Sequence, residues 1–276
     1  MMDAWTMRLS SHSAAAFSGK QHHSRLPCTV QAPSRYHTGS QQRRNKEHTL
    51  VAHAAATDVA DKKEEYNKSM GEQMNWGHLN PYEYHPERGL YYHEVAPNLL
   101  CGSQPQSPAD IECLHAEGVT NIVNLQEDKD FAYWGVDFEA YRRRAAELGM
   151  FLDRRPIVDF DGESLRRNLP RIVLAIAGAL LAGGRVYVHC TAGLGRAPAA
   201  CIAWRYWFDD MQLDEAYTAL TAIRPCGPKR EAIRAATYDL LDSRGWHEFH
   251  NLPSDAYAFL NNDDRARLQR RIPERC

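Results

Sequence analysis

Residues 186–198 read VYVHCTAGLGRAP, an apolar run followed by a short glycine-containing loop and a proline. The apolar run predicts a buried strand, and the proline favours the first turn of a helix, where its missing N–H needs no partner. A buried strand that passes through a tight loop into a helix is a unit of α/β sheets. We therefore expect a sheet flanked by helices, with this loop at the carboxyl edge of the sheet, where such folds bind ligands.

The same loop has the composition of an anion site with a nucleophile in it. Backbone N–H groups at the start of a helix converge on one point and favour negative charge there. Gly193 and Gly195 allow the chain to wind tightly, and the guanidinium of Arg196 can bind two phosphoryl oxygens. We expect the pKa of Cys190 to lie well below the value of about 8.5 for a free thiol. The alternative is a buried structural cysteine in an ordinary turn.

The rest of the chain alternates between strand and helix patterns. The apolar periodicity predicts strands at 98–101, 120–125, 151–157 and 185–189, and helices at 108–118, 136–148, 198–208, 214–223 and 229–241. Asn168 and Pro170 predict the cap and first turn of a further long helix that ends at Gly183. The order indicates an α/β fold with a mostly parallel central sheet flanked by helices.

Composition divides the chain into four segments. Residues 1–56 are rich in Ser, His, Arg and Ala and contain few acids, which is typical of an organellar transit peptide or of a disordered basic tail. Residues 57–90 are expected to form an N-terminal linker and substrate-recognition segment, whose first part, residues 57–75, predicts a surface helix or linker. Residues 91–242 hold the α/β pattern, and residues 243–276 predict a C-terminal extension packed on that domain, because they are too short for a binding domain.

Charge, cysteine and histidine usage argue against several classes of protein. The net charge is −2, and removal of a basic N-terminal segment leaves a more acidic chain, which disfavours nucleic acid and anionic membranes. The seven cysteines form no CxxC pair and the 13 histidines form no H-x3-H pair. We therefore expect neither a disulfide framework nor a metal site.

The loop Cys190–Arg196 resembles the Cys-x5-Arg signature of the dual-specificity phosphatases. Its sequence CTAGLGRA is similar to that of the same loop in the plant and algal phosphoglucan phosphatases. The likeness covers roughly residues 66–242, including the stretches NPYEYH at 80–85, GSQPQ at 102–106, LQEDKD at 125–130, DFD at 159–161 and RPCGP at 224–228. The resemblance makes residues 91–242 a dual-specificity phosphatase domain.

This resemblance implies a mechanism. Cys190 would form a cysteinyl-phosphate intermediate without a metal or any other cofactor. Asp159 would be the general acid, with Asp161 as the alternative. The phosphate would be bound by Thr191, Ala192, Gly193, Leu194, Gly195 and Arg196.

The resemblance also implies a substrate and a location. Phosphorylated starch or amylopectin would be the substrate and the chloroplast the compartment. The glucan would lie on Tyr82, Tyr84, Tyr133, Trp134 and Phe160, since flat rings pack against the C–H faces of sugars. For each single ring, core packing is the competing interpretation.

Other functions fit parts of the pattern. A dual-specificity protein phosphatase would use the same loop, with the aromatic residues along a peptide groove. A glucan-binding scaffold without activity would not need Cys190, Arg196 and Asp159 together. A rhodanese-like sulfur transferase also uses a strand-end cysteine and an arginine, but it needs no acid such as Asp159.

Overall fold

The computed structural model describes residues 44–74, 82–242 and 249–275, with side chains from residue 58 to residue 274. Residues 1–43 of the predicted transit segment lie outside this range. The described chain contains a five-stranded sheet with the order β1-β2-β5-β3-β4. The strands are β1 (Tyr92–Ala96), β2 (Leu99–Gly102), β3 (Asn121–Asn124), β4 (Phe151–Arg154) and β5 (Val186–His189).

The pairing of the strands makes the sheet mostly parallel, as the sequence predicts. Only β1 and β2 pair in antiparallel fashion, while β2–β5, β5–β3 and β3–β4 are parallel. The helices are α2 (Arg44–Gln73), α3 (Pro108–Ala116), α4 (Asp128–Trp134), α5 (Phe138–Glu147), α6 (Gly162–Leu181), α7 (Arg196–Phe208), α8 (Leu213–Ile223), α9 (Arg230–Leu241) and α11 (Asn262–Arg271); short 3₁₀ turns lie at Pro86–Arg88 and Pro273–Arg275.

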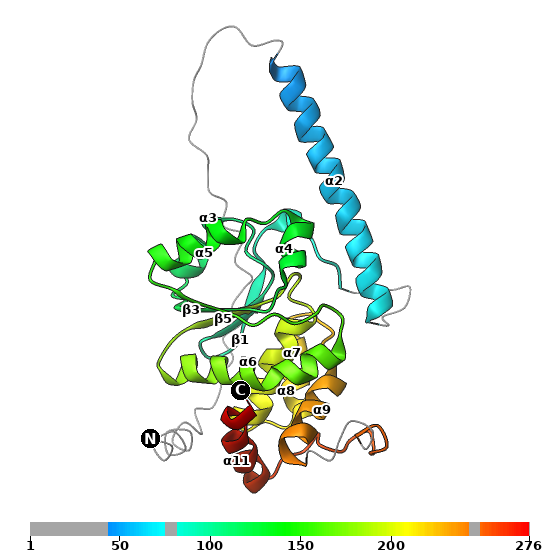
Figure 1. Cartoon of the computed structure of the whole chain (residues 1–276), viewed down its shortest axis with the longest axis vertical. Helices are drawn as coiled ribbons and strands as arrows, with labels where there is room; N and C mark the ends of the chain where they lie inside the picture. Colours follow the sequence, from blue (N-terminus) through cyan, green and yellow to red (C-terminus); the bar gives the residue numbers. More distant parts are fainter. Residues whose placement is uncertain (1–43, 75–81, 243–248, 276) are drawn as a thin grey trace.

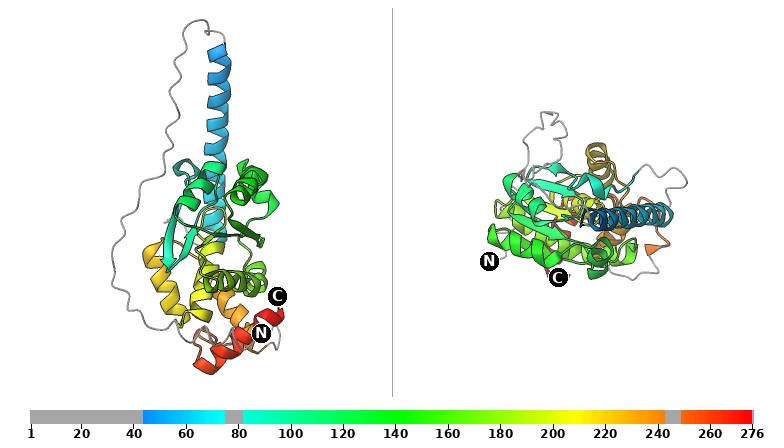
Figure 2. Two further views of the ribbon diagram at one scale, coloured as in Figure 1. Left: turned by 90° about the vertical axis from the view of Figure 1, so that its left-hand side faces the viewer. Right: turned by 90° about the horizontal axis from the view of Figure 1, so that it is seen from above.

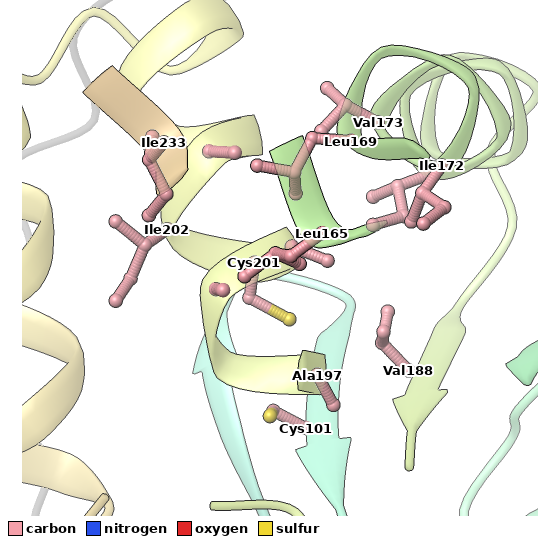
Figure 3. Close-up of a cluster of buried hydrophobic side chains, with 14 of the residues drawn as sticks. Cys101, Leu165, Leu169, Ile172, Val173, Val188, Ala197, Cys201, Ile202 and Ile233 are labelled. Atoms are coloured by element: carbon pink, nitrogen blue, oxygen red, sulfur yellow. The ribbon is translucent and has the colours of Figure 1, made fainter. Parts of the chain in front are cut away.

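Helices cover both faces of the sheet, and alternate side chains of each strand serve the two faces (Figure 1). On β5, Val186 and Val188 belong to the larger core with α6, α7 and α9, whereas Tyr187 belongs to the smaller core with α3 and α5. Figure 3 shows the larger core, where Val188 faces the apolar side of α6. Strand β5 is therefore buried on both faces of the sheet, and packing on both faces fixes the position of its carboxyl end.

Helix α6 begins earlier than the sequence predicts. Asp161 is its N-cap and accepts hydrogen bonds from two N–H groups of the first turn, so Asn168 and Pro170 lie inside the helix. The predicted cap at Asn168 is wrong. A proline inside a helix is unfavourable, but both the residues before it and those after it bury apolar side chains in the main core, from Leu165 onward. Tertiary packing thus outweighs local preference here.

Two further elements differ from expectation. Helix α4 is not predicted from the sequence, although its Glu127 and Asp130 form a capping box at its start. The predicted boundary at residue 56 falls inside α2, which continues from Arg44 to Gln73. The N-terminal part of α2 projects beyond the domain and its C-terminal end reaches the domain surface (Figure 2).

The C-terminal residues belong to the same core. Leu268 of α11 and Ile272 are buried in the larger cluster, and α11 packs against α7 and α9. Leu260 joins the same cluster. In the part of the chain for which side chains are described, no helix is long and apolar enough to cross a membrane.

Candidate active site

The loop after β5 has the geometry of a phosphate cradle. Cys190 follows β5 directly, is only 3% exposed, and is separated from the start of α7 at Arg196 by a tight turn. Gly193 has a positive φ of 69°, and a Cβ there would lie 2.4 Å from the carbonyl of Gly102. Only glycine fits at this position, because both the conformation and the space exclude a side chain.

Arg196 lies under the loop in the middle of a network of charges. Its Nη1 donates to Asp130 Oδ2 at 2.7 Å, and its Nη2 lies 2.8 Å from Asp159 Oδ2. Nη2 also donates to the hydroxyl of Thr191 at 3.0 Å. The side chain is 4% exposed. One guanidinium is therefore shared between two carboxylates, while its Nε has no hydrogen-bond partner among the described residues and can donate to a phosphoryl oxygen.

The charge network changes the expected chemistry of the thiol. Burial raises the pKa of Cys190; the Arg196 guanidinium lowers it, the Asp159 carboxylate raises it, and the backbone N–H of Ala197 lowers it. The net direction is upward, so the expectation of a pKa below that of a free thiol is wrong for this arrangement. The largest cause is burial, which disfavours the charged thiolate, and the nearby Asp159 carboxylate adds to it.

The two candidate acids have different surroundings. Asp159 contacts Arg196, and burial raises the pKa of its carboxyl above its usual value. A raised pKa favours the protonated form that a general acid needs. Asp161 accepts N–H groups at the start of α6 and lines the same cavity as Asp159 without an ion pair to Arg196. The geometry favours Asp159 as the acid and gives Asp161 a capping role.

The backbone between these two aspartates is strained and held in place. Phe160 has a positive φ of 60°, which costs a non-glycine residue about 1–3 kcal/mol. Its carbonyl accepts a hydrogen bond from Lys229, and the N–H of Val158 donates to Ser164 at 3.0 Å. The strained residue Phe160 therefore lies next to the candidate acid Asp159, and contacts from α6 and from the start of α9 hold this backbone in its conformation.

Arg224 braces the phosphate loop from behind. It is fully buried, and its Nε donates to the carbonyl of Gly193 at 2.7 Å while its Nη2 donates to that of Ala192 at 3.2 Å. Its Nη1 reaches His93 Nδ1 at 3.2 Å. By holding two carbonyls back, Arg224 leaves the N–H groups of the loop free to face the cavity. The sequence resemblance includes this residue without assigning it a role.

A chain of hydrogen bonds links the cradle to an aromatic side chain. Gln126 Nε2 donates to Thr191 Oγ1 at 3.2 Å and to Gln104 Oε1 at 2.8 Å. Gln104 Nε2 then donates to the hydroxyl of Tyr84 at 3.0 Å. Since Thr191 also receives a hydrogen bond from Arg196, the position of Tyr84 is coupled to that of the catalytic guanidinium.

Three of the five predicted glucan residues, Tyr82, Tyr84 and Phe160, line cavities that cradle residues also line, and Trp134 and Tyr133 join them through ring contacts. The rings of Tyr84 and Trp134 meet edge to face with centroids 5.1 Å apart, as do those of Tyr133 and Trp134. Phe160 lines the cavity that contains Cys190. Tyr82 lines a neighbouring cavity of about 260 Å³ together with Tyr84. We call Tyr84, Tyr133, Trp134 and Phe160 the aromatic platform.

Tyr66 of α2 packs on this platform, which the sequence does not predict. Its ring centroid lies 5.9 Å from that of Tyr84, 5.4 Å from that of Trp134 and 6.0 Å from that of Phe160. Its hydroxyl donates to Asp159 Oδ2 at 3.3 Å. Burial raises the pKa of the Tyr66 phenol well above its usual value, so the group is a neutral donor.

The side chains that were described hold no evident metal centre. Among them, no group of three or more His, Cys, Asp and Glu residues lies close enough together to hold a metal ion. Positive charge at the cavity comes from Arg196, from Lys229, which also lines it, and from the N-terminus of α7.

Comparison with known proteins agrees with this geometry. Residues 100–235 match the family model described as "Dual specificity phosphatase, catalytic domain". This range contains β2 to β5, the cradle and Arg224, and it leaves out α2, Tyr82 and Tyr84.

Three relatives extend the comparison. The chain is 35% identical over 232 residues to phosphoglucan phosphatase DSP4, amyloplastic, of Castanea sativa, covering 81% of this chain and 61% of the relative. It is 31% identical over 199 residues to phosphoglucan phosphatase LSF1, chloroplastic, of Arabidopsis thaliana, covering 72% and 33%. It is 28% identical over 149 residues to laforin of Mus musculus, covering 50% and 45%.

The chain thus spans less than two thirds of the length of each of these relatives. The match to the family model nevertheless contains both the cradle and its supporting strands. Residues 100–235 therefore form a dual specificity phosphatase catalytic domain, and plant phosphoglucan phosphatases are among the proteins that the chain resembles.

Proposed function

We propose that this protein is a phosphoglucan phosphatase that removes phosphate monoesters from starch-like glucans through a cysteinyl-phosphate intermediate. The observation that carries the proposal is the aromatic platform beside a cradle that holds Cys190, Arg196 and Asp159 in one cavity. The cradle supplies chemistry suited to any phosphate monoester. The platform supplies the flat apolar surfaces that suit the faces of glucose rings.

In the first half of the proposed reaction, the Cys190 thiolate attacks phosphorus and the bond from phosphorus to the sugar oxygen breaks. An alkoxide is a poor leaving group, so the Asp159 carboxyl gives its proton to that oxygen as the bond breaks. The products of this half are a neutral sugar hydroxyl and phosphocysteine. Two observations support this role for Asp159: it lines the same cavity as Cys190, and burial raises the pKa of its carboxyl.

In the second half, water attacks phosphocysteine and the thiolate of Cys190 leaves. Asp159, now a carboxylate, takes the proton from the attacking water and so returns to its starting form. The N–H groups of the loop and Arg196 bind the phosphoryl oxygens in both halves. Arg196 and Asp159 lie 2.8 Å apart, so this ion pair breaks before Asp159 acts as a protonated acid.

The interior of the cradle favours a sparsely charged substrate. Thr191, Ala192 and Leu194 are neutral, so the loop offers no second cation for a neighbouring phosphate. A glucan with widely spaced monoesters can bind this loop with one phosphate, and no second phosphate is then left next to it without a cation. The relatives named phosphoglucan phosphatases support the same substrate class.

We extend the proposal to a location and to the first residues of the chain. Two relatives are named amyloplastic and chloroplastic, and residues 1–56 have the composition of a transit peptide. We therefore place the protein in the plastid, with residues 1–56 as the targeting segment. Expression of the chain fused at its C-terminus to a fluorescent protein, with and without residues 1–56, tests this location.

The activity is tested by comparing phosphate release from phosphorylated amylopectin with release from phosphotyrosine and phosphothreonine peptides. The proposal expects the larger kcat/KM per phosphate on amylopectin. A clear preference for the peptides would instead support the dual-specificity protein phosphatase. Turnover of no phosphate ester at all would leave only a binding function.

A further inference from the structure

Helix α2 reaches the catalytic cavity itself. Met70 is 2% exposed and lines the cavity together with Cys190, and Met74 lines it as well. A Cβ placed on Gly195 would lie 3.9 Å from the terminal methyl of Met74. The C-terminal end of α2 therefore covers the mouth of the cradle.

The space that remains is too small for a substrate. The cavity has a volume of about 30 Å³, and one water needs about 10–15 Å³ of such space. A phosphate monoester with its sugar or phenol cannot enter while Tyr66, Met70 and Met74 keep these positions. Substrate binding and this placement of α2 exclude each other.

Tyr66 also makes the contacts that the substrate would make. Its ring lies against three rings of the aromatic platform, and its hydroxyl bonds to the candidate acid Asp159. The proposed reaction brings a sugar oxygen to Asp159 and glucose faces to the same rings. The side chain thus lies where the sugar would lie, and its hydroxyl donates to Asp159 as the released sugar hydroxyl would donate to the Asp159 carboxylate.

Polar contacts hold the segment in place. The side chain of Asn67 exchanges two hydrogen bonds with the backbone of Tyr84, at 2.8 and 3.1 Å. The hydroxyl of Tyr133 lies 3.0 Å from the carbonyl oxygen of Lys62. Lys63 pairs with Glu87 at 2.8 Å on the surface. Water can replace most of these groups when the segment leaves, because most of them lie at or near the surface.

We propose that residues 62–74 of α2 form an intramolecular cover that occupies the place of the substrate, with Tyr66 as its central contact. The cover must move away before any phosphate ester reaches Cys190. The part of this inference that concerns glucan rests on the proposed function. The occlusion of the cavity applies to every substrate, so a small aryl phosphate tests it independently.

The test uses the full chain with Tyr66→Ala, Tyr66→Phe and the control Lys68→Ala, since Lys68 is exposed on the same helix. We measure kcat/KM for para-nitrophenyl phosphate and for phosphorylated amylopectin. If the open form is roughly 10% of the molecules, uncovering the site raises kcat/KM by up to about tenfold. Tyr66→Ala should approach this gain on the aryl phosphate, Tyr66→Phe should gain less, and Lys68→Ala should match the wild type.

The opposite result would overturn the cover. If Tyr66→Ala lowers kcat/KM for amylopectin and leaves the aryl phosphate unchanged while the melting temperature is retained, Tyr66 is part of the glucan surface. Unchanged rates on both substrates would also contradict the inference. A wild type inactive on amylopectin would refute the proposed function, yet a gain on the aryl phosphate would still support the cover.

Hydrogen exchange gives a second readout that does not depend on a variant's stability. The amides of residues 62–74 should exchange faster when the wild-type protein binds phosphorylated amylopectin, because the glucan displaces them. Orthovanadate, which fills the cradle, should have the same effect. Slower exchange of these amides with either ligand would mean that α2 closes over the substrate, and the inference would be wrong.

Discussion

The two sides of the active site are built in different ways. The phosphate side consists of Cys190 to Arg196, one continuous loop between a buried strand and a helix, braced by Arg224. The side that we propose to bind the sugar, called the sugar side below, consists of Asp159 and the aromatic platform, which come from three separate segments of the chain. The phosphate side depends on local geometry, so it suits any phosphate monoester. The sugar side depends on tertiary packing, so it can select the alcohol.

The two sides meet at Arg196. Its guanidinium is paired with Asp159 of the sugar side and hydrogen-bonded to Thr191 of the phosphate side. Through Gln126 and Gln104, Thr191 is connected to Tyr84 of the platform. The comparison predicts that changes on the phosphate side affect all substrates, whereas changes on the sugar side affect glucan more than aryl phosphate.

The largest effect is expected for Cys190→Ser. Loss of the nucleophile should reduce turnover of both substrates by roughly 10⁴-fold or more. The variant should still bind phosphorylated amylopectin, because the loop N–H groups and Arg196 remain. Steady-state phosphate release and a pull-down with insoluble glucan measure the two properties. Activity within tenfold of the wild type would remove Cys190 from the mechanism.

Asp159→Asn should show an effect that depends on the leaving group. On glucan phosphate the rate should fall by roughly 10²- to 10⁴-fold, the usual contribution of general acid catalysis. A nitrophenolate leaves without a proton, so the loss on para-nitrophenyl phosphate should be much smaller. Parallel kcat measurements on the two substrates give the result.

Asp161→Asn is the matched control for this variant. Its carboxylate caps α6 and does not pair with Arg196, so its removal should lower both rates to a similar, smaller extent. If Asp161→Asn instead shows the dependence on the leaving group, the two roles are reversed. If neither variant shows it, the proton comes from another group.

Arg224→Lys should test the brace behind the phosphate side. Lysine cannot hold two carbonyls in a fixed fork, and a displaced loop should lower kcat by roughly 10²-fold on both substrates. Arg234→Lys is the control, because Arg234 is also buried and donates to the carbonyls of Pro253 and Ala256, away from the loop. Arg234→Lys should lower the melting temperature and keep kcat. Equal loss of kcat in both variants would make Arg224 merely structural.

The charge network at Arg196 also affects the pKa of the Cys190 thiol, which is a smaller effect that a pH series can measure. Asp159 contributes to the raised pKa of the Cys190 thiol, so Asp159→Asn should lower this pKa. A lower pKa means that the thiolate persists to lower pH. The rate of alkylation by iodoacetamide as a function of pH measures it, with Asp161→Asn as the comparison. A thiol pKa that stays constant or rises in Asp159→Asn would contradict the charge network.

The sequence predicts the phosphate side better than the sugar side, for a physical reason. Cys190, Gly193 and Arg196 lie in one loop whose geometry follows from the strand before it and the helix after it. The parallel sheet follows equally from the alternation of strands and helices. Local patterns of this kind are what a sequence records directly.

Contacts between segments that lie far apart in the chain leave no such local pattern in the sequence. Asp130 and Tyr66 reach the site from helices far away in the chain, and nothing in their local sequence indicates a partner there. The choice between Asp159 and Asp161 also needed the fold, because either residue could cap a helix. The raised pKa of Cys190 follows first from burial and then from the nearby Asp159 carboxylate, and neither can be read from the spacing of residues along the chain.

The central claim is that the sugar side selects glucan, and Trp134→Ala tests it most directly. Loss of this half-buried ring should lower the ratio of kcat/KM on phosphorylated amylopectin to kcat/KM on para-nitrophenyl phosphate by about tenfold, equivalent to about 1.4 kcal/mol. Trp204→Ala, which removes a half-buried tryptophan of α7 that packs on the main core, should leave this ratio unchanged. A ratio that also stays constant in Trp134→Ala would contradict the claim, since the platform would then be core packing alone.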